Sequence, residues 1–168
     1  MDRQRPISVI GIAGWKNSGK TTLVERLIAE FTRRGLRVSS IKHTHHDIRA
    51  EAPSSDSARH RRAGACEVIL AGDGPSEHRL DDVIGRLAPC DLVIVEGFKA
   101  APIAKIEVRR AAQLDRRELA PMDASFIAVA SDYATDPGSL PLYSLNDVPA
   151  IADFITRTLE LAVGSNSE

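Results

Sequence analysis

One short pattern limits the fold of this chain more than any other feature. Residues 14–21 read Gly-Trp-Lys-Asn-Ser-Gly-Lys-Thr and match the pattern G-x-x-x-x-G-K-[ST]. The apolar, β-branched run at residues 7–13 predicts a buried parallel strand before it. Residues 22–34 carry apolar side chains at helical spacing and predict a helix after it. The chain therefore begins with a strand, a glycine-containing loop and a helix.

The loop has the composition of a phosphate-binding site. Successive backbone N–H groups form an anion nest, and the helix N-terminus adds partial positive charge. Gly14 and Gly19 allow close approach of the backbone to a phosphate. Lys20 is placed to reach β- and γ-phosphates, and the Thr21 hydroxyl to bind Mg²⁺. The predicted nucleotide-binding residues here are Gly14, Trp15, Lys16, Asn17, Ser18, Gly19, Lys20, Thr21 and Thr22.

Strand and helix signals alternate through the rest of the chain. Strands are predicted at residues 38–42, 67–70, 91–97, 103–109, 125–130 and 140–143, and helices at 56–63, 80–87 and 147–161. This alternation predicts an α/β protein with the three-layer P-loop NTPase fold, a mostly parallel sheet flanked by helices. Residues 1–163 are expected to form one nucleotide-binding domain, and residues 164–168 a disordered tail.

The segment 103–109 alternates between apolar and charged residues. Such alternation predicts an exposed or edge strand. An exposed strand carrying Ile103, Ile106 and Val108 favours pairing with a second copy. The sequence therefore predicts a homodimer formed through residues 103–110 and the turn region 72–80.

Composition argues against several functions. A net charge of −1 gives no overall attraction to nucleic acid or to a membrane surface, so neither is expected as a partner. Aromatic residues make up 4% of the chain, too few for a base-stacking platform. Cys66 and Cys90 lack metal-site spacing and are expected to be reduced, partly buried thiols of a cytoplasmic protein. No segment has the pattern of a signal peptide or membrane span.

An acidic residue ends the apolar strand at residues 91–97. In a P-loop protein such a residue faces the Mg²⁺ side of the site. Glu96 is therefore predicted to bind Mg²⁺ through water or to orient the attacking water. Gly97 is predicted to let the backbone approach the γ-phosphate. The alternative is an ordinary strand-end residue that reaches solvent.

Residues 42–47, Lys-His-Thr-His-His-Asp, follow another predicted strand. The favoured interpretation is a switch segment in which Asp47 contacts the γ-phosphate or Mg²⁺. A polar loop without a special role is the second, and a transition-metal site at the three histidines is the third. The predicted Mg²⁺ ligands are thus Thr21, Asp47 and Glu96, and the predicted catalytic residues are Asp47 and Glu96.

Asp132 follows the strand at 125–130 and is a candidate for reading the base. Guanine presents two adjacent N–H donors that one carboxylate can accept, and adenine cannot supply that pair. Asp132 is therefore predicted to select GTP, with Asn146 and Asp147 forming the other wall of the base pocket. The alternative is that these residues serve only in turns and helix caps.

The chain resembles MobB, the molybdopterin-guanine dinucleotide biosynthesis adapter family. The resemblance rests on residues 14–23, 42–47, 56–57, 63–65, 95–99 and 104–106, in the same order over nearly the whole chain. It implies GTP and Mg²⁺ binding, weak GTPase activity, homodimers and assistance to a MobA-type guanylyltransferase that joins GMP to molybdopterin.

Two functions from other classes stay open. One is a small-molecule kinase with Arg59, Arg61 and Arg62 as lid residues. The other is a metallochaperone GTPase that holds a metal through His43, His45 and His46.

Overall fold

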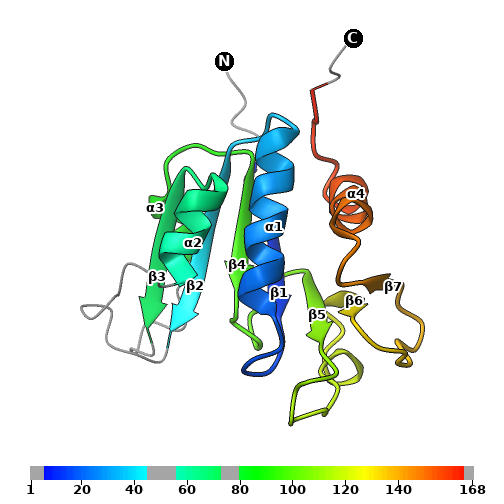
Figure 1. Cartoon of the computed structure of the whole chain (residues 1–168). Helices are drawn as coiled ribbons and strands as arrows, with labels where there is room; N and C mark the ends of the chain where they lie inside the picture. Colours follow the sequence, from blue (N-terminus) through cyan, green and yellow to red (C-terminus); the bar gives the residue numbers. More distant parts are fainter. Residues whose placement is uncertain (1–5, 45–55, 73–79, 165–168) are drawn as a thin grey trace.

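The computed structural model describes residues 6–44, 56–72 and 80–164, and the elements below lie within them (Figure 1). The strands are β1 (Ser8–Ala13), β2 (Val38–Thr44), β3 (Glu67–Gly72), β4 (Leu92–Glu96), β5 (Lys105–Arg109), β6 (Phe126–Ser131) and β7 (Leu142–Ser144). The helices are α1 (Lys20–Arg33), α2 (Asp56–Ala63), α3 (Leu80–Arg86) and α4 (Val148–Thr158), with a short 3₁₀ helix η3 (Ala120–Met122).

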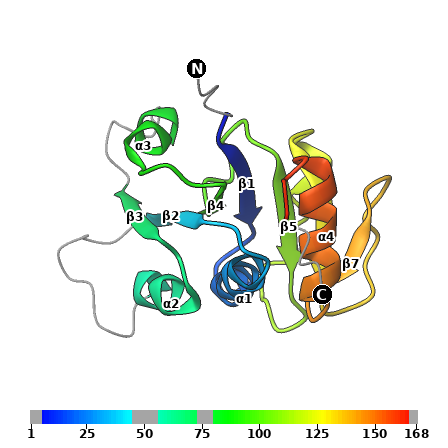
Figure 2. The ribbon, with the colours of Figure 1, turned by 90° about the horizontal axis from the view of Figure 1, so that it is seen from above.

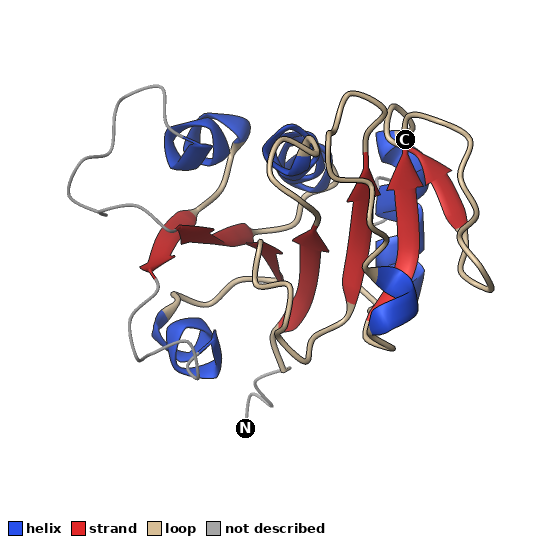
Figure 3. Cartoon of the chain, turned by 90° about the horizontal axis from the view of Figure 1, so that it is seen from below, coloured by secondary structure: helices blue, strands red, loops and turns tan. Residues whose placement is uncertain are grey.

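The described strands form one parallel sheet in the order β3-β2-β4-β1-β5-β6-β7. Helices α1, α2 and α4 cover one face, and α3 covers the other (Figures 2 and 3). This is the predicted three-layer α/β arrangement. None of the described helices has the length and apolar character needed to cross a membrane.

Burial on both faces explains why the central strands are continuously apolar. Every residue of β4 is buried. On the face covered by α1, Ile10 and Ile12 of β1 pack in one cluster with Leu27 and Phe31 of the helix. A second cluster joins Val93 and other residues of the sheet to α3. Each fully buried side chain of this kind contributes about 1.5–3 kcal/mol.

β5 is a central strand, so the prediction of an exposed or edge strand is wrong. It pairs with β1 on one side and β6 on the other. Its charged residues Lys105, Glu107 and Arg109 are all buried. They lie on the face opposite to Ile106 and Val108, which pack in the cluster with α1. A strand that alternates apolar and charged residues looks the same in sequence whether its charged face is exposed to water or covered by a polar segment of the chain. In β5 the charged face is covered by such a segment.

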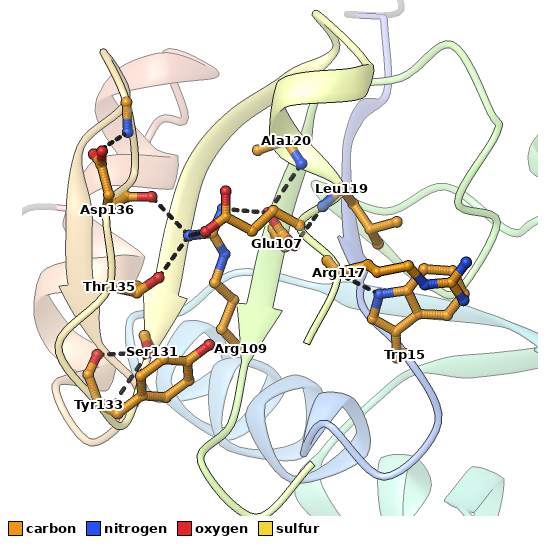
Figure 4. A network of polar contacts seen from close by, with 12 residues as sticks. Trp15, Glu107, Arg109, Arg117, Leu119, Ala120, Ser131, Tyr133, Thr135 and Asp136 are labelled. Atoms are coloured by element: carbon orange, nitrogen blue, oxygen red, sulfur yellow. Dashed lines mark hydrogen bonds and ion pairs between the residues drawn. The ribbon is translucent and has the colours of Figure 1, made fainter. Parts of the chain in front are cut away.

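That covering segment is residues 111–125, which include η3 and supply partners for the buried charges (Figure 4). Glu107 accepts hydrogen bonds from the N–H groups of Leu119 at 2.7 Å and Ala120 at 3.0 Å. Its carboxylate also pairs with Arg109 at 2.9 Å. Arg109 in turn donates to the backbone oxygen of Asp136 at 2.8 Å. The network thus ties β5 to the covering segment and to the loop after β6.

The cysteines differ in part from expectation. Both are free thiols, and Cys90 is half-buried as predicted, but Cys66 is exposed. Cys66 lies between Gly64, which ends the turn after α2, and the first residue of β3, where the chain passes over the surface.

Candidate functional site

A cleft opens where the carboxyl ends of β1, β2 and β4 meet. The strand register brings these ends together, because Glu96 lies opposite Ile12 of β1 and Lys42 of β2. The lining includes residues 16–22, 42–44 and 96–103. Most of the predicted phosphate-loop residues therefore line one cleft with Glu96 and Gly97. Gly14, Trp15 and Asp132 are not part of its lining, and Asp47 lies outside the described residues.

Glycine is required at two positions of the loop, for a different structural reason at each. A Cβ on Gly14 would lie 2.6 Å from Ser18 Oγ and 2.8 Å from the carbonyl oxygen of Val108. Gly19 has φ 86°, in the left-handed region that glycine adopts at little cost, and it is the N-cap of α1. The helix begins at Lys20, two residues earlier than predicted. Lys20 and Thr21 consequently stand on its first turn, next to the loop.

The start of α1 is electropositive. Among the described residues, no side chain caps the N-terminus of this helix, and its first turn holds no acidic residue, so no residue of the helix itself offsets the positive end of the dipole. The Lys20 ammonium folds back to donate to the carbonyl oxygens of Gly14 at 2.7 Å and Trp15 at 3.2 Å. Burial is the main cause of a lowered pKa of Lys20. The Glu96 carboxylate acts to raise this pKa, and the positive charges of Lys99 and Lys42 lower it. An anion placed here would relieve this accumulation of positive charge.

Thr21 and Glu96 form the link between the loop and β4. The Thr21 hydroxyl donates to Glu96 Oε1 at 2.5 Å. Because the hydroxyl proton is used in this bond, the oxygen lone pairs of Thr21 remain available to a cation. Burial acts to raise the pKa of Glu96, but hydrogen bonds from His60 and Thr21 outweigh it, and the net pKa lies below its usual value. An ionised carboxylate beside a hydroxyl oxygen fits Mg²⁺, which takes few protein ligands and completes its shell with phosphate and water.

Gly97 and Phe98 carry the chain away from Glu96 with positive φ values of 90° and 52°. A Cβ on Gly97 would lie 3.0 Å from the Cβ of His43. The His43 ring packs against Phe98, with the ring centroids 4.7 Å apart. His45, His46 and Asp47 lie outside the described residues, and no group of three metal-binding side chains occurs within them.

Three basic residues at the cleft were missed or underrated by the sequence reasoning. Arg110 follows β5 beside the phosphate loop, since a Cβ on Gly19 would lie 3.7 Å from its Cδ. Arg59 of α2 donates to Thr22 Oγ1 at 3.3 Å. Lys42 forms an ion pair with Asp56. The position of Arg110 at the carboxyl end of a parallel strand was the available signal, because ligands bind at that edge of such sheets.

Asp132 stands at the carboxyl end of β6, and its carboxylate is already engaged. Oδ1 accepts the backbone N–H of Ala111 at 2.6 Å, and Oδ2 lies 3.8 Å from Arg110 Nε. Asp147 accepts the N–H of Ala150 at 3.1 Å as the N-cap of α4, which is the role named as the alternative to a base-pocket wall.

Comparison with known proteins adds independent information. The family model described as "Molybdopterin guanine dinucleotide synthesis protein B" matches residues 9–132. A molybdopterin-guanine dinucleotide biosynthesis adapter protein of Haemophilus influenzae is 40% identical, over 95% of this chain and 92% of its own length. The adapter protein of the same name from Escherichia coli K12 is 37% identical, over 92% of this chain and 94% of its own.

Solved structures agree with this result. The crystal structure of a MobB homologue from Bacillus stearothermophilus is 30% identical and covers 90% of this chain and 97% of its own, with a TM-score of 0.59. HypB from Helicobacter pylori, solved in complex with nickel, aligns with a TM-score of 0.55 at 19% identity, covering 96% of this chain and 91% of its own. At that identity the second likeness concerns the fold alone.

Proposed function

Since this chain belongs to the MobB family of molybdopterin guanine dinucleotide synthesis proteins, we propose that it is a GTP-binding adapter in the formation of that dinucleotide. The observation that carries the nucleotide part is the hydrogen bond between Thr21 and Glu96, which joins the phosphate loop to the end of β4. A hydroxyl and a carboxylate so arranged beside an uncapped helix N-terminus suit a Mg²⁺–triphosphate.

The residues of the loop would divide the work of binding. Backbone N–H groups at the start of α1 would hold phosphate oxygens, and Lys20 would exchange the carbonyls of Gly14 and Trp15 for them. Thr21 would offer its lone pairs to Mg²⁺, which neutralises charge on the phosphates when bound. Arg110, beside Gly19, would add a further cation at the phosphates.

The state of Glu96 supports slow rather than fast hydrolysis. Its Oε1 accepts from Thr21, and its Oε2 lies 2.9 Å from His60 Nε2. Its lowered pKa makes it a weak base, whereas an efficient general base has a pKa near the working pH. We therefore assign Glu96 to holding Thr21 and the water around Mg²⁺. Asp47, outside the described residues, remains the proposed second acidic residue of the site.

Binding measurements test the nucleotide part. Isothermal titration calorimetry of GTP with Mg²⁺ should show binding to the wild type, and Lys20→Ala should weaken it roughly 10- to 150-fold, the loss expected for one charge-assisted contact of about 1.5–3 kcal/mol. Arg86→Ala is the control, because Arg86 is an exposed basic residue of α3 that is not part of the cleft lining. Equal losses in both variants, or none in Lys20→Ala, would contradict the assignment.

We propose that Asp132 selects guanine, so GTP should bind more tightly than ATP and Asp132→Asn should reduce the difference. Guanine would have to replace the present contacts of Asp132 with Ala111 and Arg110. The expected loss for GTP is about 1.5–3 kcal/mol, with little change for ATP. Equal affinity of the wild type for GTP and ATP would remove this role from Asp132.

The adapter part concerns partners. We propose that the chain acts in the cytoplasm as a homodimer and assists a MobA-type guanylyltransferase. β5 lies inside the sheet and cannot pair with a second copy, and residues 73–79 of the predicted turn region lie outside the described residues. Sedimentation at micromolar concentration with GTP checks the dimer, and co-purification with the guanylyltransferase, with and without GTP, checks the adapter role. A monomer, or no co-purification in either condition, would count against the respective part.

The kinase alternative has little geometric support. Of its three lid arginines, Arg59 lines the cleft but pairs with Glu25 at 2.6 Å. Arg61 and Arg62 are exposed on α2.

A further inference from the structure

His60 is fully buried and stands directly behind the site. It lies on α2 on the same side as Ser57, which is also fully buried. Its Nε2 is 2.9 Å from Glu96 Oε2, and its Nδ1 is 2.9 Å from Ser40 Oγ, a buried hydroxyl of β2. In the sequence this histidine lies within the basic run Arg-His-Arg-Arg at residues 59–62.

These contacts form one continuous line from β2 to the phosphate loop. Ser40 contacts His60, His60 contacts Glu96, and Glu96 accepts the hydroxyl of Thr21 at 2.5 Å. Three elements therefore meet at one carboxylate, namely α2, β4 and α1. Oε1 of Glu96 accepts a hydrogen bond from Thr21, and Oε2 is in ion-pair contact with His60, so each oxygen has a neighbour in the line.

Counting protons along the line assigns the tautomer of the ring. The ionised Glu96 can only accept, so Nε2 must carry a hydrogen to satisfy it. A neutral imidazole then has an acceptor at Nδ1, which the Ser40 hydroxyl can satisfy as donor. The Thr21 and Ser40 hydroxyls are hydrogen-bonded in this arrangement, whereas His60 Nε2 and Glu96 Oε2 lie 2.9 Å apart at ion-pair distance without the alignment of a hydrogen bond.

We propose that His60 is a positioning residue of the nucleotide site: it orients Glu96 so that the carboxylate takes the Thr21 proton and leaves the Thr21 oxygen open to Mg²⁺. His60 would thereby determine how strongly Mg²⁺ enhances the binding of a triphosphate. The inference rests on the proposed function, because it needs a Mg²⁺–triphosphate in this cleft.

A role confined to packing makes a different prediction. A buried residue that only fills space on α2 would affect folding stability and would change nucleotide affinity equally with and without Mg²⁺. A positioning residue acts through the metal, and partners in this second layer typically contribute 10- to 100-fold to metal affinity.

Calorimetry with GTP, in Mg²⁺ and in EDTA, separates the two roles. His60→Leu should reduce the Mg²⁺ enhancement of GTP affinity roughly 10- to 100-fold and leave the affinity in EDTA within about threefold. His60→Gln should restore most of the enhancement, because its amide can place an N–H near the position of Nε2. Equal losses in Mg²⁺ and EDTA, or an unchanged enhancement in His60→Leu, would overturn the inference.

Two further measurements keep the result interpretable. Imidazole ¹⁵N shifts of the nucleotide-free wild type should show the Nε2–H tautomer of His60, and the Nδ1–H tautomer would overturn the proposed line. If His60→Leu fails to fold, Ser40→Ala replaces it and should lower the Mg²⁺ enhancement by loosening the ring, while no change would again overturn the inference. The two proposals fail in different ways. If the wild type does not bind GTP, the proposed function is wrong. If the wild type binds GTP and the variants keep the Mg²⁺ enhancement, only the role of His60 is wrong.

Discussion

Replacing Glu107 by Gln should destabilise the protein strongly, because it breaks a buried ion pair from one side. Glu107 is 2% exposed, and its carboxylate is 2.9 Å from the Arg109 guanidinium. Removing one partner of such a pair costs about 3–5 kcal/mol, since the other charge stays buried without its counter-ion. Glu118 lies 3.3 Å from Arg109 and partly compensates. We therefore expect the lower end, about 3 kcal/mol.

Urea unfolding followed by circular dichroism measures this loss directly. For a chain of this size, about 3 kcal/mol corresponds to a fall in Tm of roughly 6–12 °C. Asp115→Asn is the matched control, because it breaks the ion pair with Arg117 at 2.6 Å in which the Arg117 side chain is 73% exposed. Exposed pairs contribute about 0–1 kcal/mol.

A double variant tests the cause of the effect. Replacing Glu107 by Gln and Arg109 by Met together removes both charges and keeps a side-chain acceptor near the N–H groups of Leu119 and Ala120, and removal of a whole buried pair is often neutral or stabilising. The double variant should therefore be more stable than Glu107→Gln. A loss below about 1 kcal/mol in Glu107→Gln, equal to that of the control, would refute the reasoning.

Two further predictions follow from local geometry. Gly14→Ala should abolish tight GTP binding, because its Cβ would come within 2.8 Å of both Ser18 and the Val108 carbonyl oxygen, and calorimetry that finds wild-type affinity would contradict this. Stability should also fall as the pH drops from about 4.5 towards 2, because the pKa of Glu30 is lowered to about 2 in the folded protein. The hydrogen bond from Arg33 is the main cause of the lowered pKa. Burial acts to raise the pKa, and a hydrogen bond from Arg34 lowers it further. A depressed folded-state pKa gives stability that is present above the unfolded value and lost below it. Glu30→Gln should reduce the difference between urea midpoints at pH 7 and pH 3, and an unchanged difference would exclude Glu30 as a source.

The sequence was informative wherever side-chain chemistry and chain order coincide. The loop at residues 14–21 and the strand ending in Glu96 predicted both the sheet and the cleft, because parallel strands bring their carboxyl ends to one edge. Family membership also followed from such segments. The prediction that β5 is an exposed or edge strand was wrong, because an alternation of apolar and charged residues does not reveal which segment covers the charged face.

His60 was missed for a related reason. In a run of Arg, His, Arg and Arg, the composition suggests solvent, although α2 has no large aliphatic residue to bury. The face of α2 that packs against the sheet therefore buries polar side chains instead, namely Ser57 and His60, which are three residues apart. The lack of an apolar stripe was the usable signal. The contact with Glu96 depends on tertiary packing of α2 and could not be read from the sequence.

The surroundings of Trp15 make the phosphate loop visible to spectroscopy. Trp15 is the only tryptophan of the chain. Its indole N–H donates to the Arg117 carbonyl oxygen at 2.7 Å (Figure 4), and the Lys99 ammonium and the Arg117 guanidinium lie 4.0 Å and 4.5 Å from the ring centroid. Indole emission responds to nearby charge and to the loss of such a bond, so the unlabelled protein carries its own fluorophore at the loop. Rapid mixing with nucleotide, followed by this emission, would give the rate at which the loop rearranges.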